Sequence, residues 1–202
     1  MSADNQNPLS AYFRQPSIFL NLPSGGRYWP PGSIELPASG EVGIMPMTAR
    51  DEITMRTPDS LMNGSSVVEM IASCIPAIKD PWKIPSVDLD AILIAIRIAS
   101  YGESMEITAA CPKCEVSNEY EIDLRSMLDQ IKRIDQEFVV THGDLTLQLR
   151  PNNYKDINDA NLETFEEQRM LQLANNTELS EQQRMEQFQV LFKRMTDKTV
   201  AG

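Results

Sequence analysis

The longest apolar pattern in the chain covers residues 87–100, which we predict to form one buried helix. Apolar side chains occupy almost every position from Leu89 to Ile98, so this helix has no polar face for solvent. Ser86 suits its N-terminus, and Gly102 suits the left-handed position after its last turn. We therefore expect this helix at the centre of the fold. Its most deeply buried side chains should be Ile92, Ile96 and Ala99.

Two later segments alternate between apolar and polar positions, as in β-strands with one covered face. Residues 103–109 and 118–124 should pair as a hairpin that carries two cysteines at its tip. Residues 137–141 and 145–150 should form a second hairpin, which turns at residues 142–144.

The other elements are shorter. Residues 17–22 and 41–47 read as strands of a small N-terminal β unit, with residues 34–36 between them. Thr48 should cap a helix that Pro58 ends, and a further helix should begin at residue 65 or 66. A short helix over 126–133 and two amphipathic helices after residue 153 complete the pattern.

These elements predict an α+β fold. It should contain a central buried helix, two β-hairpins, a small N-terminal β unit and a C-terminal helical hairpin. We divide the chain into a flexible arm over residues 1–12, an α+β domain over 13–150 and the helical hairpin over 151–202.

The net charge of the chain argues against two classes of binding partner. The 202 residues include 18 basic and 29 acidic side chains, a net charge of −11, which argues against nucleic acid or an anionic membrane as the main ligand. The longest charge-free apolar run, from Ala91 to Ile96, is too short to span a bilayer. The first residues lack the basic and apolar segments of a secretory signal, so we expect synthesis in the cytosol.

The sequence gives little support to catalysis. It contains neither a phosphate-binding Gly-x-x-x-x-Gly-Lys loop nor a dinucleotide-binding Gly-x-Gly-x-x-Gly motif. A single histidine leaves little room for a Ser-His-Asp or Cys-His arrangement. We therefore expect a protein that is not an enzyme.

The most specific local motif is the pair Cys111 and Cys114. Two thiols at this spacing on a hairpin tip match half of a zinc-ribbon site. Cys74 and His142 are the remaining Cys and His residues, so one chain could supply three cysteines and one histidine, or two chains could share an ion through two pairs. A thioredoxin-like redox pair and a reduced knuckle without metal are the other interpretations. The alternative for Cys74 is a buried, inert thiol, and the alternative for His142 is a solvated residue in a turn.

Two aromatic residues suggest a partner contact. Tyr28 and Trp29 lie between Gly25-Gly26 and Pro30-Pro31-Gly32, in a loop that regular structure cannot accommodate. Rigid aromatic loops make good interface anchors. The alternative is a loop folded back over its own core. The C-terminal helices could likewise pack locally or dock on another subunit.

Short motifs also follow one another in a characteristic order over residues 13–124. They are Phe19–Gly26, Met45–Glu52, Thr57–Gly64, Ser73–Pro76, Asp88–Arg97, Ala99–Gly102 and Cys111–Cys114. This series resembles the baseplate proteins of T4-like contractile-tailed bacteriophages, a group of hub subunits and hub assembly proteins. Residues beyond about 151 carry no such resemblance. Glu115 stands where the family pattern often has glycine after the second cysteine.

The resemblance implies a non-enzymatic role in the phage tail, either as a baseplate hub component of the virion or as an assembly factor, a chaperone of hub assembly. Other tail and baseplate proteins would be its partners, and self-association is compatible with this role. The resemblance also implies a location in the host cytoplasm during assembly, or in the tail baseplate of the virion. From a different class, a cytosolic zinc-knuckle module that binds proteins is the runner-up, and a thiol oxidoreductase is the third hypothesis.

Overall fold

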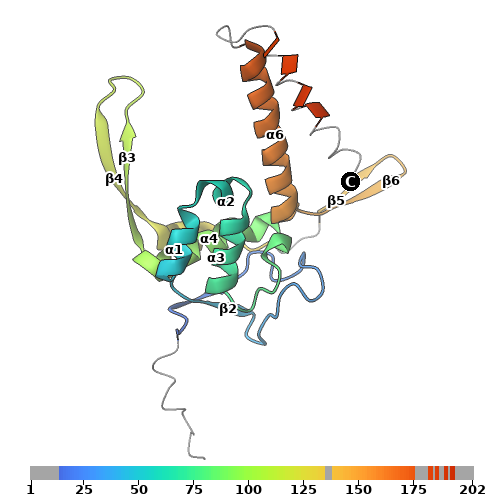
Figure 1. Cartoon of the computed structure of the whole chain (residues 1–202). Coiled ribbons are helices and arrows are strands. Elements are labelled where there is room, and N and C mark those ends of the chain that lie inside the picture. The colour runs from blue at the N-terminus through green and yellow to red at the C-terminus, as the bar shows by residue number, and fades with distance from the viewer. Residues whose placement is uncertain are drawn as a thin grey trace, which may run out of the picture. The chain divides into compact units, whose positions relative to one another are not determined.

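The computed structural model describes residues 14–134 and 138–175, together with 182–183, 185–186, 189–190 and 192–193. The described residues form six α-helices, one short 3-10 helix and three two-stranded antiparallel sheets (Figure 1), which confirms the α+β class. The arm predicted over residues 1–12 lies outside the described residues, as does most of the second C-terminal helix.

The chain divides into two units, residues 1–155 and 156–202. Helix α6 (Tyr154–Asn175) begins at the end of the first unit and continues into the second. Among the described residues, the other named helices and strands and the buried apolar side chains all lie in the first unit.

The core is built on helix α4 (Ser86–Tyr101), as the apolar pattern predicts. Ile92 and Ile96 are almost wholly buried, which confirms the expectation for both, whereas Ala99 is half-buried. The residue before the helix is Pro85, so Ser86 is its first residue and not its cap. Gly102 follows the last turn with a φ of 89°, a left-handed value that favours glycine.

Three short helices lie together next to α4 (Figure 1): α1 (Ala49–Met55), α2 (Pro58–Met62) and α3 (Ser65–Cys74). Thr48 caps α1, as the sequence predicts. The structure adds a reciprocal bond, in which the Asp51 carboxylate accepts the Thr48 backbone N–H and completes a capping box. Pro58 has a different role from the expected one. It is the first residue of α2, where its missing N–H costs nothing.

The small N-terminal sheet pairs β1 (Ile18–Asn21) with β2 (Glu41–Ile44). Leu20, Val42 and Ile44 point into the core from it. Ile34 does not join this sheet. It forms an isolated bridge with Ile78 instead, so the predicted N-terminal β unit has two strands.

Both predicted hairpins are present. β3 (Ser104–Ala110) pairs with β4 (Ser117–Asp123), and β5 (Phe138–His142) pairs with β6 (Leu145–Leu149). Helix α5 (Leu124–Gln130) follows β4, and the Asp123 carboxylate accepts two backbone N–H bonds at its start. At the foot of the first hairpin, Met105 and Ile122 pack against the core.

A polar cluster joins α1, α3 and the segment before β1. Arg14 donates to the backbone carbonyl and the hydroxyl of Ser73, both at 2.9 Å, and its guanidinium lies 3.6 Å from the Asp51 carboxylate. Burial disfavours the charged form of Asp51. This effect is outweighed by the hydrogen bonds from Thr48 and Ser73 and by the charge of Arg14. The pKa of Asp51 is therefore lowered.

A second polar cluster lies deeper, at the start of α4. The carboxylate of Asp88 has no solvent exposure and accepts three hydrogen bonds. Ser24 donates its backbone N–H at 2.7 Å and its hydroxyl at 2.5 Å, and the Trp29 indole N–H donates at 2.8 Å. Because both donors lie about 60 residues away in sequence, this carboxylate fixes the N-terminal loop against the central helix.

Removal of this carboxylate should destabilise the fold. Asp88→Ala leaves the buried donors of Ser24 and Trp29 without an acceptor, and we expect a loss of about 3 kcal/mol in the free energy of unfolding. Asp90 on the same helix is exposed, and Asp90→Ala should cost less than about 1 kcal/mol. Urea denaturation of both variants measures the difference. Equal losses would show that Asp88 does not hold the loop.

The same carboxyl should leave a signature in the pH dependence of stability. Burial raises its pKa above the ordinary value of 3.8, against the opposing effect of the bonds from Ser24 and Trp29. A raised pKa in the folded state contributes stability that is complete below the unfolded pKa and is lost as pH rises through the folded pKa. The wild-type protein should therefore lose free energy of unfolding relative to Asp88→Asn as pH rises from below 3.8 to neutrality. Denaturation curves across this range test the sign, and a pH-independent difference would contradict it.

Candidate functional site

The candidate site begins with the loop of residues 23–33, which we call the aromatic loop. It consists of consecutive tight turns, closed by Gly25 N–H to the Leu22 carbonyl at 2.8 Å and by Ser33 N–H to the Pro30 carbonyl at 3.1 Å. Gly25 and Gly26 have φ values of 60° and 83°, a region where a side chain would be strained. The glycines therefore permit the reversal that turns the chain back over α4.

The two aromatic residues of this loop have different environments. Trp29 is 8% exposed and belongs to the core, with its indole N–H on Asp88. The expectation that prolines and glycines keep both rings out of the core is wrong for Trp29, because the buried carboxylate supplies a partner for its polar edge. Tyr28 is half-buried and lines a surface pocket. A partner contact by this loop stays a prediction.

A second segment, residues 152–154, also lies beside the N-terminal end of α4. The Asn152 carbonyl accepts the Ser86 N–H at 2.8 Å, and the Tyr154 N–H donates to the Ile84 carbonyl at 2.8 Å. The Tyr154 ring stacks on Trp82 with centroids 5.5 Å apart. These contacts hold the chain just after β6 beside the helix start that also holds Trp29, so the end of β6 lies next to the aromatic loop.

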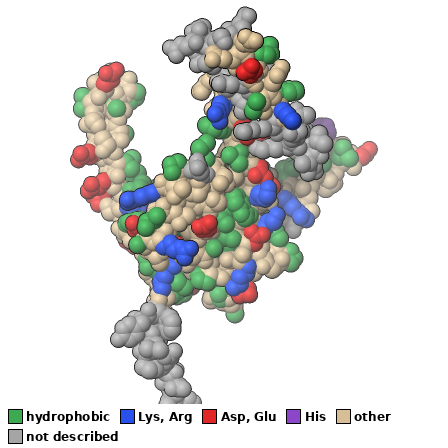
Figure 2. Space-filling view, viewed as in Figure 1, with side chains coloured by type: hydrophobic (Ala, Val, Ile, Leu, Met, Phe, Trp, Pro, Cys, Tyr) green, Lys and Arg blue, Asp and Glu red, His purple; other side chains and the backbone are tan. Residues whose placement is uncertain are grey.

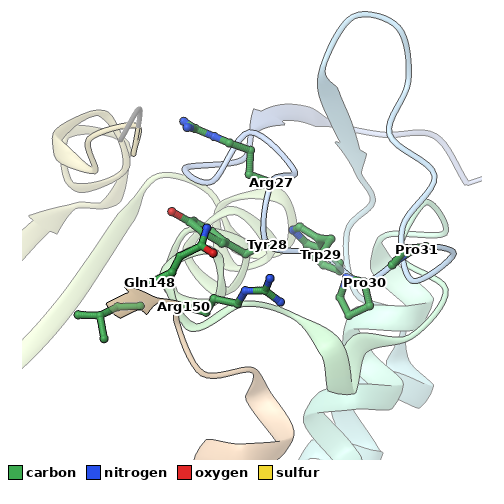
Figure 3. A pocket seen from close by; sticks show the side chains of 8 residues that line it. Arg27, Tyr28, Trp29, Pro30, Pro31, Gln148 and Arg150 are labelled. Atoms are coloured by element: carbon green, nitrogen blue, oxygen red, sulfur yellow. The ribbon is translucent and has the colours of Figure 1, made fainter. Parts of the chain in front are cut away.

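The pocket between these two segments has a volume of about 410 Å³. Its lining residues are Arg27, Tyr28, Trp29, Pro30, Pro31, Gln148, Leu149 and Arg150. Figure 3 shows the Tyr28 and Gln148 side chains next to each other, and the Arg150 guanidinium turned toward Pro30. The charged lining residues are both arginines, in a chain whose net charge is −11. The pocket therefore favours an anionic group.

The second hairpin adds an apolar surface to this pocket. In its register, Phe138 faces Leu149 and Val140 faces Leu147, whereas Thr141 faces Thr146 on the opposite side. All strand residues of this hairpin are exposed, and Leu145, Leu147 and Leu149 are each at least 50% exposed. We call the side with Phe138, Val140, Leu145, Leu147 and Leu149 the apolar ribbon. Because Leu149 also lines the pocket, the two surfaces are continuous.

Sequence reasoning predicted Tyr28 and Trp29 but missed the other side of the pocket. Gln148, Leu149 and Arg150 come from a strand about 120 residues later, and only the tertiary fold brings them beside the loop. One signal was present in the sequence. The alternation of Leu145, Leu147 and Leu149 predicts an apolar face, and such a face requires a cover.

The four predicted metal ligands do not converge. Cys74 is fully buried at the end of α3, and Arg14 lies 3.3 Å from its sulfur. Burial raises the pKa of the Cys74 thiol, so it favours the neutral form. His142 lies at the tip of the β5–β6 hairpin, whereas Cys111 and Cys114 lie at the tip of β3–β4. Within the described ranges, no three His, Cys, Asp or Glu side chains gather to hold a metal ion.

The Cys111–Cys114 turn has a defined geometry of its own. The Glu115 N–H bonds the Cys111 carbonyl at 2.9 Å, and the Cys111 N–H bonds the Val116 carbonyl at 2.9 Å. Backbone N–H groups of Lys113 and Cys114, followed by the Cys114 thiol, hydrogen-bond the Cys111 sulfur and lower the pKa of Cys111. Strands flank the turn on both sides, and no helix begins at the pair as in a thioredoxin-like motif.

Comparison with known families decides the affiliation of the chain. The family described as T4 bacteriophage base plate protein matches residues 16–197. The chain belongs to this family. The match includes the C-terminal segment beyond residue 151, where the short motifs indicated no resemblance, so the family covers most of the chain. Comparison with curated proteins and with solved structures gives no match.

Membership of this family supports a structural role for the protein in the phage baseplate. Its role in a protein assembly agrees with a site built from an aromatic loop, a basic pocket and an apolar ribbon. None of the helices that the structure describes is long and apolar enough to cross a membrane.

The separate environments of the two aromatic residues lead to a prediction. Trp29→Ala removes a core ring together with its bond to Asp88, and should lower the free energy of unfolding by about 4 kcal/mol. Tyr28→Ala truncates a half-buried pocket residue and should cost about 1 kcal/mol. Chemical denaturation of the two single variants measures both values. A Trp29→Ala protein as stable as Tyr28→Ala would place the indole outside the core.

Proposed function

We propose that this baseplate protein is a component of the baseplate hub or an assembly factor for it, and that it acts through protein–protein contacts without catalysis. The family supports a baseplate role in general, and the finer role rests on the surfaces of the described chain. The observation that carries the proposal is the apolar ribbon, a hydrophobic sheet face that is exposed along its whole length and leads into the pocket beside Tyr28.

Exposure of this surface is unfavourable, because apolar side chains are stabilised by removal from water. Phe138, Val140, Leu145, Leu147 and Leu149 all lie on one side of a two-stranded sheet, each about half exposed or more. Contiguous apolar patches of this kind mark interaction sites on soluble proteins, because burying them in a complex removes apolar area from water. A two-stranded hairpin is also only marginally stable by itself. A partner that covers the ribbon would remove the apolar patch from water and would also stabilise the hairpin.

The pocket defines the other half of the contact. Tyr28 provides a large ring with a polar edge, and Pro30 and Pro31 restrict the loop before binding, so docking loses less conformational entropy. Arg150 adds positive charge to the pocket, whereas the Arg27 guanidinium donates to the Ser24 and Ile134 carbonyls. We propose that the bound surface of the partner carries apolar side chains over the ribbon and a carboxylate at Arg150.

Charge placement on the hairpin provides a sharp test. Leu147→Asp puts a carboxylate into the apolar ribbon, whereas Thr146→Asp puts the same group on the opposite face of the same hairpin. We expect Leu147→Asp and Tyr28→Ala each to weaken binding to a hub protein of the same phage by about tenfold or more, since a hot-spot side chain contributes about 2 kcal/mol. Thr146→Asp should bind as the wild type does. Isothermal titration calorimetry with each purified hub protein measures the affinities.

These measurements test the contact through the apolar ribbon and the hub role separately. Equal weakening by Leu147→Asp and Thr146→Asp would show that the ribbon is not the contact. Binding to peripheral baseplate proteins and to no hub protein would overturn the hub assignment. Mass spectrometry of purified particles then distinguishes a hub component, which is present in the finished tail, from an assembly factor, which is absent from it.

A further inference from the structure

The cysteine turn at the tip of β3–β4 has the backbone of a metal-binding knuckle. The Cys111 N–H bonds the Val116 carbonyl and the Glu115 N–H bonds the Cys111 carbonyl, both at 2.9 Å, so the chain reverses tightly around the two thiols. Glu115 has a φ of 57°, the left-handed conformation that glycine adopts most easily. A non-glycine residue in this region is strained, so the turn keeps the knuckle geometry although the favourable residue is absent.

This geometry suits one class of ligand. Thiolates are the ligands of soft or borderline cations such as Zn²⁺, which takes four ligands in a tetrahedron. The pair supplies two of four ligands, and in the described part of the chain no third His, Cys, Asp or Glu joins it. The remaining ligands must therefore come from outside the described chain.

The position of the pair favours a second molecule as their source. Strands of seven residues carry the tip roughly 23 Å from the foot of the hairpin at about 3.3 Å per residue. Almost all residues of β3 and β4 are exposed, and Cys114 at the tip is exposed as well. A second copy of the same tip offers two identical thiols, and a two-fold axis through the ion would complete a tetrahedron of four cysteine sulfurs.

We propose that Cys111 and Cys114 form half of a zinc site, which the same two cysteines of a second copy of this chain complete. On binding, the four thiols release their protons to solvent, and four thiolates coordinate one Zn²⁺. This self-association is separate from the contact through the apolar ribbon, which lies on the other hairpin.

Charge makes the association dependent on the metal. Glu106, Glu119 and Glu121 are exposed along the hairpin, and Figure 2 shows acidic side chains on it. Two such hairpins repel each other when they approach tip to tip, and the divalent ion offsets part of that repulsion. Copies without metal should therefore remain apart.

The test uses the full chain, purified under reducing conditions without chelator and titrated with zinc chloride. We expect about one zinc ion per two chains by elemental analysis. Light scattering should give a mass of twice 22.7 kDa with zinc and of 22.7 kDa after EDTA. Cys111→Ser and Cys114→Ser should each reduce bound zinc to less than about a tenth of an ion per chain and abolish the dimer.

His142→Ala is the matched control, because His142 is an exposed alternative ligand at the tip of the other hairpin. It should keep both the zinc and the dimer. One zinc per monomer, zinc lost in His142→Ala, or a dimer that persists in EDTA would each overturn the proposal. So would a protein that takes up no zinc while its circular dichroism shows it to be folded.

Discussion

The buried carboxylate of Asp88 is the contact on which the arrangement of the candidate site depends. An ionisable group with no exposure is costly in a protein interior unless donors surround it, and Ser24 and Trp29 supply three hydrogen bonds from one loop. Asp88 also lies in the first turn of α4, where the helix dipole favours negative charge. The loop must therefore fold over the helix start, and this turns Tyr28 toward the surface beside the end of β6.

The first unit combines this core with apolar surfaces that are exposed in the described part of the chain. Inside it, the Asp88 and Asp51 clusters join segments that are far apart in sequence, and isoleucines of α3 and α4 are among the buried side chains of the core. At its surface, β5 and β6 have no buried residue. A stable interior next to an uncovered apolar sheet is the division expected of a protein that is completed by its neighbours. The baseplate family agrees with such a role.

The two hairpins present different chemistry to those neighbours. The β5–β6 hairpin offers leucines next to two arginines, which favours burial of an apolar segment with a negative charge. The β3–β4 hairpin has an acidic surface and a tip with two thiols, which suits a cation more than an apolar partner. Because these surfaces differ in both polarity and sign of charge, one chain can hold two different contacts without competition between them.

The sequence alone determined the elements whose cause is local. The apolar run of α4, the Thr48 cap of α1 and the alternation of both hairpins were predictable, because each depends on neighbours within a few residues. Ordered motifs also indicated the baseplate family over the first part of the chain, although the family match extends to residue 197.

The tertiary structure decided everything that depends on a distant partner. Glycines and prolines around Trp29 suggested an exposed ring, and only a carboxylate 59 residues away explains why the indole is buried. Likewise, spacing could not show that Cys74 faces the core while His142 and the cysteine pair occupy the tips of two different hairpins. Side-chain periodicity specifies which face of an element is apolar, but not which element covers that face, since this depends on contacts between segments that the local sequence does not encode.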